Sequence, residues 1–391
     1  MIVAIVAIPV GLLARDVVVA LNRPGGDPVA ARITQVVRDW GGGPLVNRIE
    51  RWYFTSNAPR TGGVPRGGIP AVAAPVGVRP VRPGPTTSTQ APPDTPTAMT
   101  PFVATPLADE GVWQPTGKLV AGRPVVYQAF LRPDATHTSL LTGVVWMRGT
   151  DIRAAQYNGI DIPGGSGWRY GSSIAPAEYP ALLAAMNGGF RLDDSRGGYY
   201  AEGRTVKPLV DGRATVATFD DGRITVGQWA RDIGPTADLA SARQNLDLIV
   251  DGGAPVPGLQ RGDNYRWGAT LGGDVFVWRS GVGVDARGNL IYAAGQVDIV
   301  SLANVLARAG AVRAMELDIN PGWVSFYTYT GTTPADIRGQ RLLGSIDRPD
   351  DRYLRTGTRD FIAVFGRDTP RSGPTPSTTA APGAKGAGYV P

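Results

Sequence analysis

Proline is distributed unevenly along this chain of 391 residues, and the distribution limits which parts can fold. Of 34 prolines, twelve lie in residues 59–107 and five in residues 370–391. Stretches rich in Pro, Thr, Gly and Ala bury too little apolar surface to offset the entropy lost on ordering them. We therefore expect one globular domain over residues 108–369, preceded by a disordered linker and followed by a disordered tail.

The excess positive charge lies outside this expected domain. The net charge of the chain is +6, of which residues 1–107 contribute +5, residues 108–369 contribute −1 and residues 370–391 contribute +2. A domain that binds nucleic acid carries basic and aromatic residues together on its own surface. The near-neutral domain therefore excludes nucleic acid as the expected partner.

Cysteine is absent, and His137 is the single histidine. These counts exclude disulfides, a thiolate nucleophile, and zinc or iron–sulfur sites with Cys ligands. A metal centre built from several histidines is excluded as well. Acid–base or nucleophilic chemistry must therefore fall on carboxylates, hydroxyls or arginines, and we expect no metal and no cofactor.

The N-terminus is apolar. Residues 1–14 carry no charge and are followed by Arg15 and Asp16. Fourteen residues are fewer than the ~20 that span a bilayer, but they suit the apolar region of a signal peptide. An uncleaved anchor and a buried amphipathic helix are the alternatives. We expect residues 1–22 to be a signal peptide or a membrane anchor that includes a transmembrane helix.

Residues 23–58 form the next expected segment, a helical one beside the membrane. It contains Trp40, Trp52 and Tyr53, and aromatic residues of this kind gather at membrane interfaces. The segment predicts a location in the cell envelope, either membrane-anchored or secreted, with the domain on the extracytoplasmic side.

Short apolar segments separated by glycine turns fill the domain, and they indicate strands. The expected strands are 125–131, 140–147, 181–190, 214–219, 224–229, 246–251, 275–279, 282–285, 289–294, 313–319, 324–327 and 361–365. One helix is predicted at 298–309, with Asp298 as its N-cap and Gly310 after its end. Weaker helices are expected at 176–185 and 237–242. The pattern predicts an α+β fold: a strand-rich mixed-sheet domain with few helices.

The segment 313–320 combines core-forming and polar residues in alternation. Because side chains in a strand alternate between faces, Met315 and Leu317 fall on one face. Glu316, Asp318 and Asn320 fall on the other. Two neighbouring carboxylates repel each other unless a cation, an arginine or a difference in protonation relieves them. This predicts a functional strand; the alternative is an edge strand with a solvated face.

Four segments of the chain, in order, resemble motifs of the phosphodiester glycosidase family. They are Ala184-Ala185-Met186-Asn187-Gly188-Gly189-Phe190, Arg279-Ser280-Gly281-Val282-Gly283-Val284-Asp285, the helix 298–309 with Gly310-Ala311, and Met315-Glu316-Leu317-Asp318. The resemblance spans about residues 125–366. It departs after Leu317-Asp318, where the family continues with a Gly-Gly-Gly-Ser turn and this chain has Ile319-Asn320-Pro321-Gly322-Trp323.

The resemblance implies hydrolysis of a sugar phosphodiester at its anomeric carbon, which requires a carboxylate near the developing oxocarbenium centre and groups that hold the phosphate. Asp318 is the first candidate for that carboxylate because it matches the family motif. Glu316 is the second catalytic candidate, with a structural role as the alternative.

Substrate-binding candidates lie on the other motifs. Arg279 suits a bidentate phosphate clamp, and an ion pair with Glu316 or Asp318 is its alternative. Ser280 has the hydroxyl to donate to an oxyanion, or is an ordinary strand serine.

Further binding candidates lie in two turns. The turn Asn187-Gly188-Gly189 offers an amide and backbone N–H groups. Asn320 lies on the polar strand face, and Trp323 follows the carboxylate strand, where its ring can stack on a sugar.

The function predicted from sequence is that of an exported or membrane-anchored hydrolase cleaving a sugar phosphodiester linkage in envelope or exported polysaccharide. Its expected partners are a carbohydrate or sugar phosphate and, through the N-terminal segment, a membrane. The alternative is a non-catalytic glycan-binding envelope protein, because the Gly-rich turn of the family is missing.

Overall fold

The computed structural model describes residues 2–22, 29–76, 95–259, 266–267 and 276–367. Within these ranges the domain is built from three sheets and one helix, which confirms the α+β, strand-rich prediction. All pairings between named strands are antiparallel, so the sheets are antiparallel and not mixed as expected. The expected tail at 370–391 lies outside the described residues.

The largest sheet has eight strands in the order β1-β2-β3-β14-β13-β15-β11-β12. The strands are β1 (Gln114–Val120), β2 (Arg123–Leu131), β3 (Thr142–Met147), β14 (Leu290–Val297), β13 (Val277–Val284), β15 (Arg313–Glu316), β11 (Leu248–Asp251) and β12 (Ala254–Pro255). The alternative of an edge strand at 313–320 is wrong, because β15 pairs with β13 on one side and β11 on the other. The segment that carries Glu316 and Asp318 therefore continues from an interior strand of the sheet and not from its edge.

Two five-stranded sheets complete the domain. One has the order β17-β16-β5-β18-β4 and the other β7-β6-β10-β8-β9. The first comprises β17 (Arg338–Arg341), β16 (Phe326–Thr330), β5 (Leu182–Asn187), β18 (Phe361–Gly366) and β4 (Ile152–Tyr157); the second comprises β7 (Arg204–Lys207), β6 (Tyr199–Ala201), β10 (Leu239–Gln244), β8 (Ala214–Phe219) and β9 (Ile224–Gln228).

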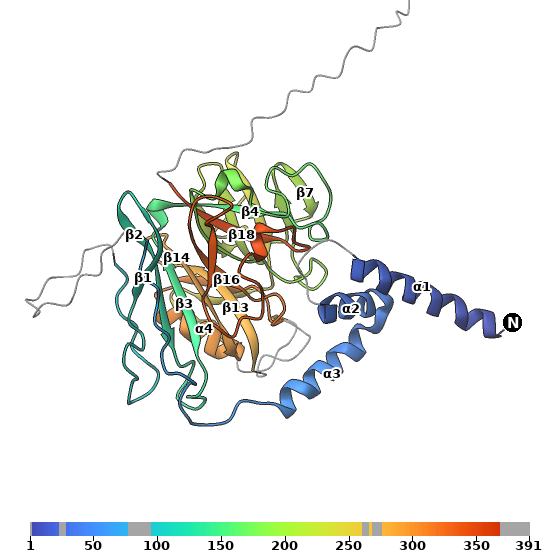
Figure 1. Cartoon of the computed structure of the whole chain (residues 1–391), viewed down its shortest axis with the longest axis horizontal. Helices are drawn as coiled ribbons and strands as arrows, with labels where there is room; N and C mark the ends of the chain where they lie inside the picture. The colour runs from blue at the N-terminus through green and yellow to red at the C-terminus, as the bar shows by residue number, and fades with distance from the viewer. Residues whose placement is uncertain (1, 23–28, 77–94, 260–265, 268–275, 368–391) are drawn as a thin grey trace, which may run out of the picture.

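The core lies on both faces of the eight-stranded sheet. On one face Val282, Tyr292 and Met315 pack against residues of β5 and β18. On the other face the helix α4 (Ile299–Arg308) packs its apolar side over the sheet (Figure 1). Asp298 caps α4 as predicted, since its carboxylate accepts from the Ser301 N–H at 2.6 Å.

Two weaker helix predictions are wrong. The segment expected to be helical at 176–185 has only the short 3-10 turn η3 (Pro176–Glu178) before β5 begins. The segment expected at 237–242 is a turn at Ala237 and Asp238 and then enters β10, which begins at Leu239. Its Leu and Ala residues favour a helix locally, but pairing of the segment with β6 and β8 decides the outcome.

The described parts of the Pro-rich stretch lie against the domain. The Val76 N–H donates to the Gly117 carbonyl at 3.0 Å and the Met99 N–H to the Gly111 carbonyl at 2.9 Å. Met99 is buried in the core beneath α4. Residues 77–94, at the centre of the predicted linker, lie outside the described residues.

Helices precede the Pro-rich stretch. They are α1 (Ile2–Asn22), α2 (Val29–Val37), a π-helical segment η1 (Arg38–Gly42) and α3 (Gly43–Ser56). Gly41 bends η1 with a φ of 83°, a conformation that favours glycine. Among the described residues no helix is long and apolar enough to cross a membrane, so the transmembrane helix expected within residues 1–22 is not found there.

Candidate functional site

A cavity of about 480 Å³ lies between the N-terminal helices and the domain. The domain contributes polar side chains, including Asp318, Asn320, Arg359 and Arg191, together with Trp323. The helices contribute residues of α2, η1 and α3. Three of the predicted site residues, Asp318, Asn320 and Trp323, therefore meet at one cavity.

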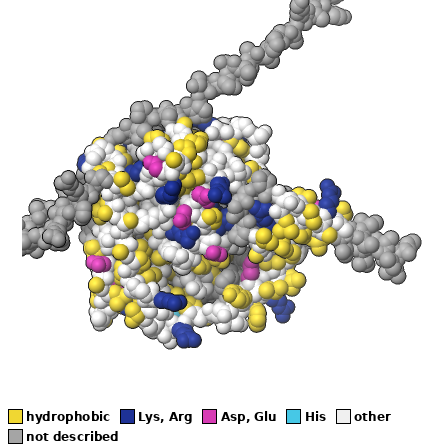
Figure 2. Space-filling model, in the orientation of Figure 1, with side chains coloured by type: hydrophobic (Ala, Val, Ile, Leu, Met, Phe, Trp, Pro, Cys, Tyr) yellow, Lys and Arg dark blue, Asp and Glu magenta, His cyan; other side chains and the backbone are white. Residues whose placement is uncertain are grey.

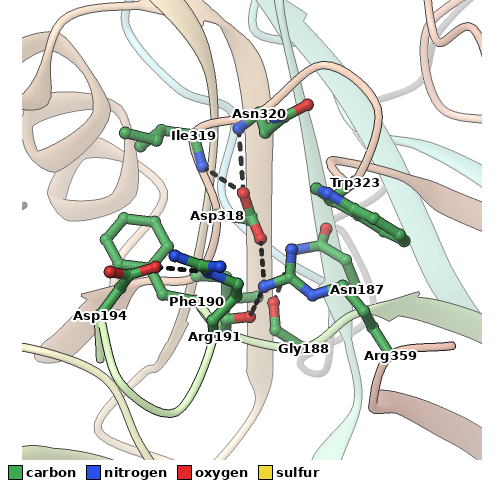
Figure 3. A network of polar contacts seen from close by, with 12 residues as sticks. Asn187, Gly188, Phe190, Arg191, Asp194, Asp318, Ile319, Asn320, Trp323 and Arg359 are labelled. Carbon is green, nitrogen blue, oxygen red and sulfur yellow. Dashed lines mark hydrogen bonds and ion pairs between the residues drawn. The ribbon is translucent and has the colours of Figure 1, made fainter. Parts of the chain in front are cut away.

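Asp318 lies just beyond the end of β15 and is held by the backbone that follows it. Its Oδ1 accepts hydrogen bonds from the Ile319 N–H at 2.8 Å and the Asn320 N–H at 3.0 Å. Its Oδ2 lies 3.3 Å from Nη2 of Arg359 (Figure 3). One oxygen is thus fixed by the turn, while the other faces a cation beside the cavity.

Burial sets the electrostatics of this carboxylate. Asp318 is only 3% exposed, and its burial raises the pKa above the ordinary value of an aspartate. The Arg359 guanidinium and the two backbone N–H groups oppose this rise in pKa. A carboxylate held in this way interacts strongly with any positive charge that develops in front of it, because little water screens it.

Trp323 is surrounded by arginines. The guanidinium carbons of Arg359, Arg352 and Arg348 lie 4.7, 5.4 and 5.6 Å from the centre of a Trp323 ring. Arg352 also donates to the Trp323 carbonyl at 2.8 Å. These contacts hold the indole in place as one wall of the cavity.

The turn that follows Asp318 closes on itself through Asn320. The Asn320 Oδ1 accepts from the Gly322 N–H at 2.8 Å, and the Trp323 N–H donates to the Asn320 carbonyl at 2.8 Å. An asparagine turn therefore presents the backbone N–H groups that hold Asp318.

Asn187 and Ser280 lie behind Asp318 and connect the sheets. The Asn187 Nδ2 donates to Ser280 Oγ at 3.0 Å, and Asn187 Oδ1 accepts from the Tyr292 hydroxyl at 2.9 Å and the Ser325 N–H at 3.1 Å. The Ser280 N–H donates to the Asp318 carbonyl at 2.9 Å. Both residues are buried and do not line the cavity, so they support the position of Asp318.

Because Gly188 and Gly189 have no side chains, the buried side chains of Asp360 and Arg243 can lie close to this turn. A methyl group on Gly188 would lie 2.7 Å from Cγ of Asp360, and one on Gly189 would lie 3.3 Å from Cζ of Arg243. The carboxylate of Asp360 pairs with Arg243 at 2.9 Å. The Gly189 carbonyl accepts from Arg359 Nη2 at 3.1 Å. The glycine turn therefore supplies close packing and a carbonyl that orients Arg359.

Glu316 and Arg279 form a buried ion pair. The Arg279 Nη1 lies 2.6 Å from Glu316 Oε1, and both side chains are almost completely buried. Burial raises the pKa of Glu316, Arg279 opposes this rise, and the nearby Asp318 charge adds to it. Neither residue lines the cavity. Arg279 is therefore in an ion pair with Glu316, which was the alternative to its expected role as a phosphate clamp.

Sequence reasoning missed the arginines of the site. Arg359, the partner of Asp318, is separated from the start of β18 by Asp360, and Arg191 lies beside the glycine turn. Asn245, which donates to the Glu316 carbonyl at 2.8 Å and accepts from the Phe190 N–H at 3.1 Å, was missed as well. The one available signal was a charged pair, Arg359-Asp360, immediately before an apolar strand.

Within the ranges that the structure describes, no group of three or more His, Asp or Glu side chains could hold a metal ion. At the cavity, the buried carboxylate of Asp318 faces arginines, an amide and an indole.

Comparisons with known proteins return distant structural similarity. No protein-family model matches the chain, and no curated protein matches it. The catalytic domain of zebrafish N-acetylglucosamine-1-phosphodiester alpha-N-acetylglucosaminidase, auto-inhibited by its pro-peptide, is 16% identical with a TM-score of 0.41, covering 67% of this chain and 91% of that chain.

Two bacterial structures are also similar. A hypothetical protein from Synechocystis is 13% identical with a TM-score of 0.37, covering 65% of this chain and 64% of that chain. A protein from Burkholderia pseudomallei, provisionally described as exported, is 15% identical with a TM-score of 0.29, covering 60% of this chain and 75% of that chain. At these scores the similarity is one of general fold only.

Proposed function

We propose that this protein is an envelope hydrolase that cleaves the bond between a sugar and a phosphodiester. The observation that carries the proposal is the setting of Asp318. It is a buried carboxylate at a cavity of about 480 Å³, with one oxygen fixed by two backbone N–H groups and the other 3.3 Å from Arg359.

Asp318 would act at the anomeric carbon. As the bond from that carbon to the phosphate oxygen breaks, its electron pair leaves with the phosphate and positive charge develops on the sugar ring. The ionised Asp318 stabilises or attacks that centre. Water then supplies a hydroxyl group to the sugar, and its remaining proton goes to solvent.

The arginines would hold the leaving phosphate. Arg359 and Arg191 both line the cavity and carry the donors that a phosphate requires. Because the phosphate monoester released from the diester is a good leaving group, it needs little help from a general acid. This fits a site whose second carboxylate, Glu316, is paired with Arg279 away from the cavity.

Trp323 would bind the sugar. Its indole lines the cavity beside Asp318, and aromatic faces commonly stack against sugar rings. The sugar phosphate would belong to envelope or exported polysaccharide. An apolar N-terminal segment typical of exported proteins supports placing the domain on the extracytoplasmic side, either anchored or secreted.

The test is release of N-acetylglucosamine from a panel of its 1-phosphodiesters by the full chain. We expect Asp318→Asn to lower kcat/KM by about 100-fold or more, as for loss of a group acting on the reacting atoms. Asp238→Asn is the matched control, because Asp238 is an exposed carboxylate outside the cavity. It should retain the activity of the unmodified chain.

Two outcomes would overturn the proposal. Full activity of Asp318→Asn would remove this carboxylate from the mechanism. Saturable binding of the same compounds by the unmodified chain, with no product, would instead establish the glycan-binding alternative. Loss of that binding in Trp323→Ala but not in Asp318→Asn would then identify the indole as the main contact.

A further inference from the structure

The cavity has two walls of different chemistry. The domain wall carries Asp318, Asn320, Arg359 and Arg191, whereas the helical wall carries Ile49, Trp52 and Tyr53 of α3 among its residues. A ligand with an anionic head and an apolar extension would match the arginines of one wall and the apolar side chains of the other.

The apolar wall is open rather than packed. Trp52 is 68% exposed, Ile49 55% and Tyr53 54%, and Leu45, four residues before Ile49, is 61% exposed. The spacing 45, 49, 52, 53 places these side chains on one side of α3. The stripe therefore runs from the cavity along the helix to the outer surface, and hydrophobic side chains gather over the N-terminal helices (Figure 2).

Ionic contacts hold this wall in position. Arg38 of η1 pairs with Glu50 of α3 at 2.7 Å, and Asp39 lies 3.5 Å from Arg191 of the domain. The exposed apolar side chains are thus fixed at the cavity by their polar neighbours and not by burial in a core. Exposed, contiguous apolar side chains of this kind mark a binding surface.

From these observations we infer that the substrate is a sugar phosphate linked to a long-chain lipid alcohol. The inference rests on the proposed function and names its substrate class. The phosphate lies at Arg359 and Arg191, the sugar lies at Asp318 and Trp323, and the lipid chain follows Ile49, Trp52 and Leu45 toward a membrane. Such a substrate supplies both kinds of surface that the cavity offers.

The test separates the lipid chain from the sugar chemistry. Calorimetry with the full chain compares the Kd of octyl phosphate, below its micelle concentration, with that of ethyl phosphate. We expect octyl phosphate to bind about ten-fold more tightly or better, because burial of two or three methylene groups gives a factor of this size. Ile49→Ser and Trp52→Ser should reduce this ratio toward one.

Val206→Ser is the matched control. Val206 is an exposed apolar residue of β7 outside the cavity, so its replacement should leave the ratio as it is. Arg359→Gln should weaken binding of both compounds equally. This result would check that the phosphate binds at the arginines of the domain wall.

Equal affinity for the two phosphates in the unmodified chain would overturn the inference. So would tighter binding of both phosphates by Ile49→Ser and Trp52→Ser, because it would make the helices a cover over the site. A change in oligomeric state with no change in the ratio would assign the stripe to a second copy of the chain. None of these results depends on sugar release, so the inference and the proposed function can fail separately.

Discussion

The chemistry of the site depends on how a few single residues are held. Burial raises the pKa of Asp318, whereas Arg359 and two backbone N–H groups face its carboxylate and favour the charged form. Asn187, Ser280 and the Asn320 turn fix the backbone around it. Burial favours the neutral form of the Asp318 carboxyl, whereas the proposed reaction requires its ionised form. Arg359 is the main group that favours the ionised form.

This balance predicts the pH dependence of sugar release. Burial places the pKa of Asp318 above its ordinary value, and protonation removes the active form, so kcat/KM should fall as the pH drops through that raised pKa. Arg359→Gln removes the largest opposing effect. The acid limb of the pH–rate profile should therefore move to higher pH.

Arg308→Gln provides the control for this experiment. Arg308 lies over Phe102 at the end of α4 and donates to the Thr100 carbonyl, outside the cavity. Its profile should match that of the unmodified chain. An acid limb that does not move in Arg359→Gln would show that Asp318 is not the titrating group.

Among the elements, the strands with strong apolar patterns were predicted and the others were not. The segments now seen as β2, β3, β8 and β18 are rich in apolar, β-branched and aromatic residues and lie between turn residues, a pattern that sequence reasoning recognises. By contrast β4, with the sequence IRAAQY, has no such pattern and is a strand because it pairs with β18. Whether such a segment becomes a strand depends on pairing partners far along the chain, and a local sequence pattern does not identify those partners.

The packing of α4 on β13 gives a prediction at the same scale. A methyl group on Gly281 would lie 2.8 Å from Cδ1 of Leu306 and 3.0 Å from the Met315 carbonyl oxygen. Gly281→Ala should therefore lower the free energy of unfolding by about 1–3 kcal/mol, because the helix must move away from the sheet. Denaturant titration measures this difference.

Gly344→Ala is the matched control. A methyl group added there meets no atom within 4 Å, so the stability should change by about 0.5 kcal/mol or less. Equal stability of the two variants would mean that α4 does not pack as closely on β13 as described.

At the scale of the whole molecule, two of the sheets bring distant segments to one place. Asn187 ends β5, Ser280 lies in β13, Asp318 follows β15 and Arg359 precedes β18. The motif order in the sequence identified Asn187, Ser280 and Asp318 as a set. Arg359 belonged to no motif, and its distance from Asp318 became visible only when the strands were paired.

The N-terminal segment shows the same limit of sequence reasoning. Its apolar and aromatic residues predicted a membrane-side location, but not that α2 and α3 would form a wall of the cavity beside Asp318. Contact between residues far apart in sequence depends on the tertiary fold, which composition and periodicity do not specify.

The most direct test of the central claim is to find which bond breaks in the proposed hydrolysis. Hydrolysis of an N-acetylglucosamine 1-phosphodiester by the full chain is run in water labelled with oxygen-18, and both products are analysed by mass spectrometry. If Asp318 acts at the anomeric carbon, the label appears in the sugar and not in the phosphate. Label in the phosphate would show that the phosphorus–oxygen bond is cleaved, and would contradict the role proposed for Asp318.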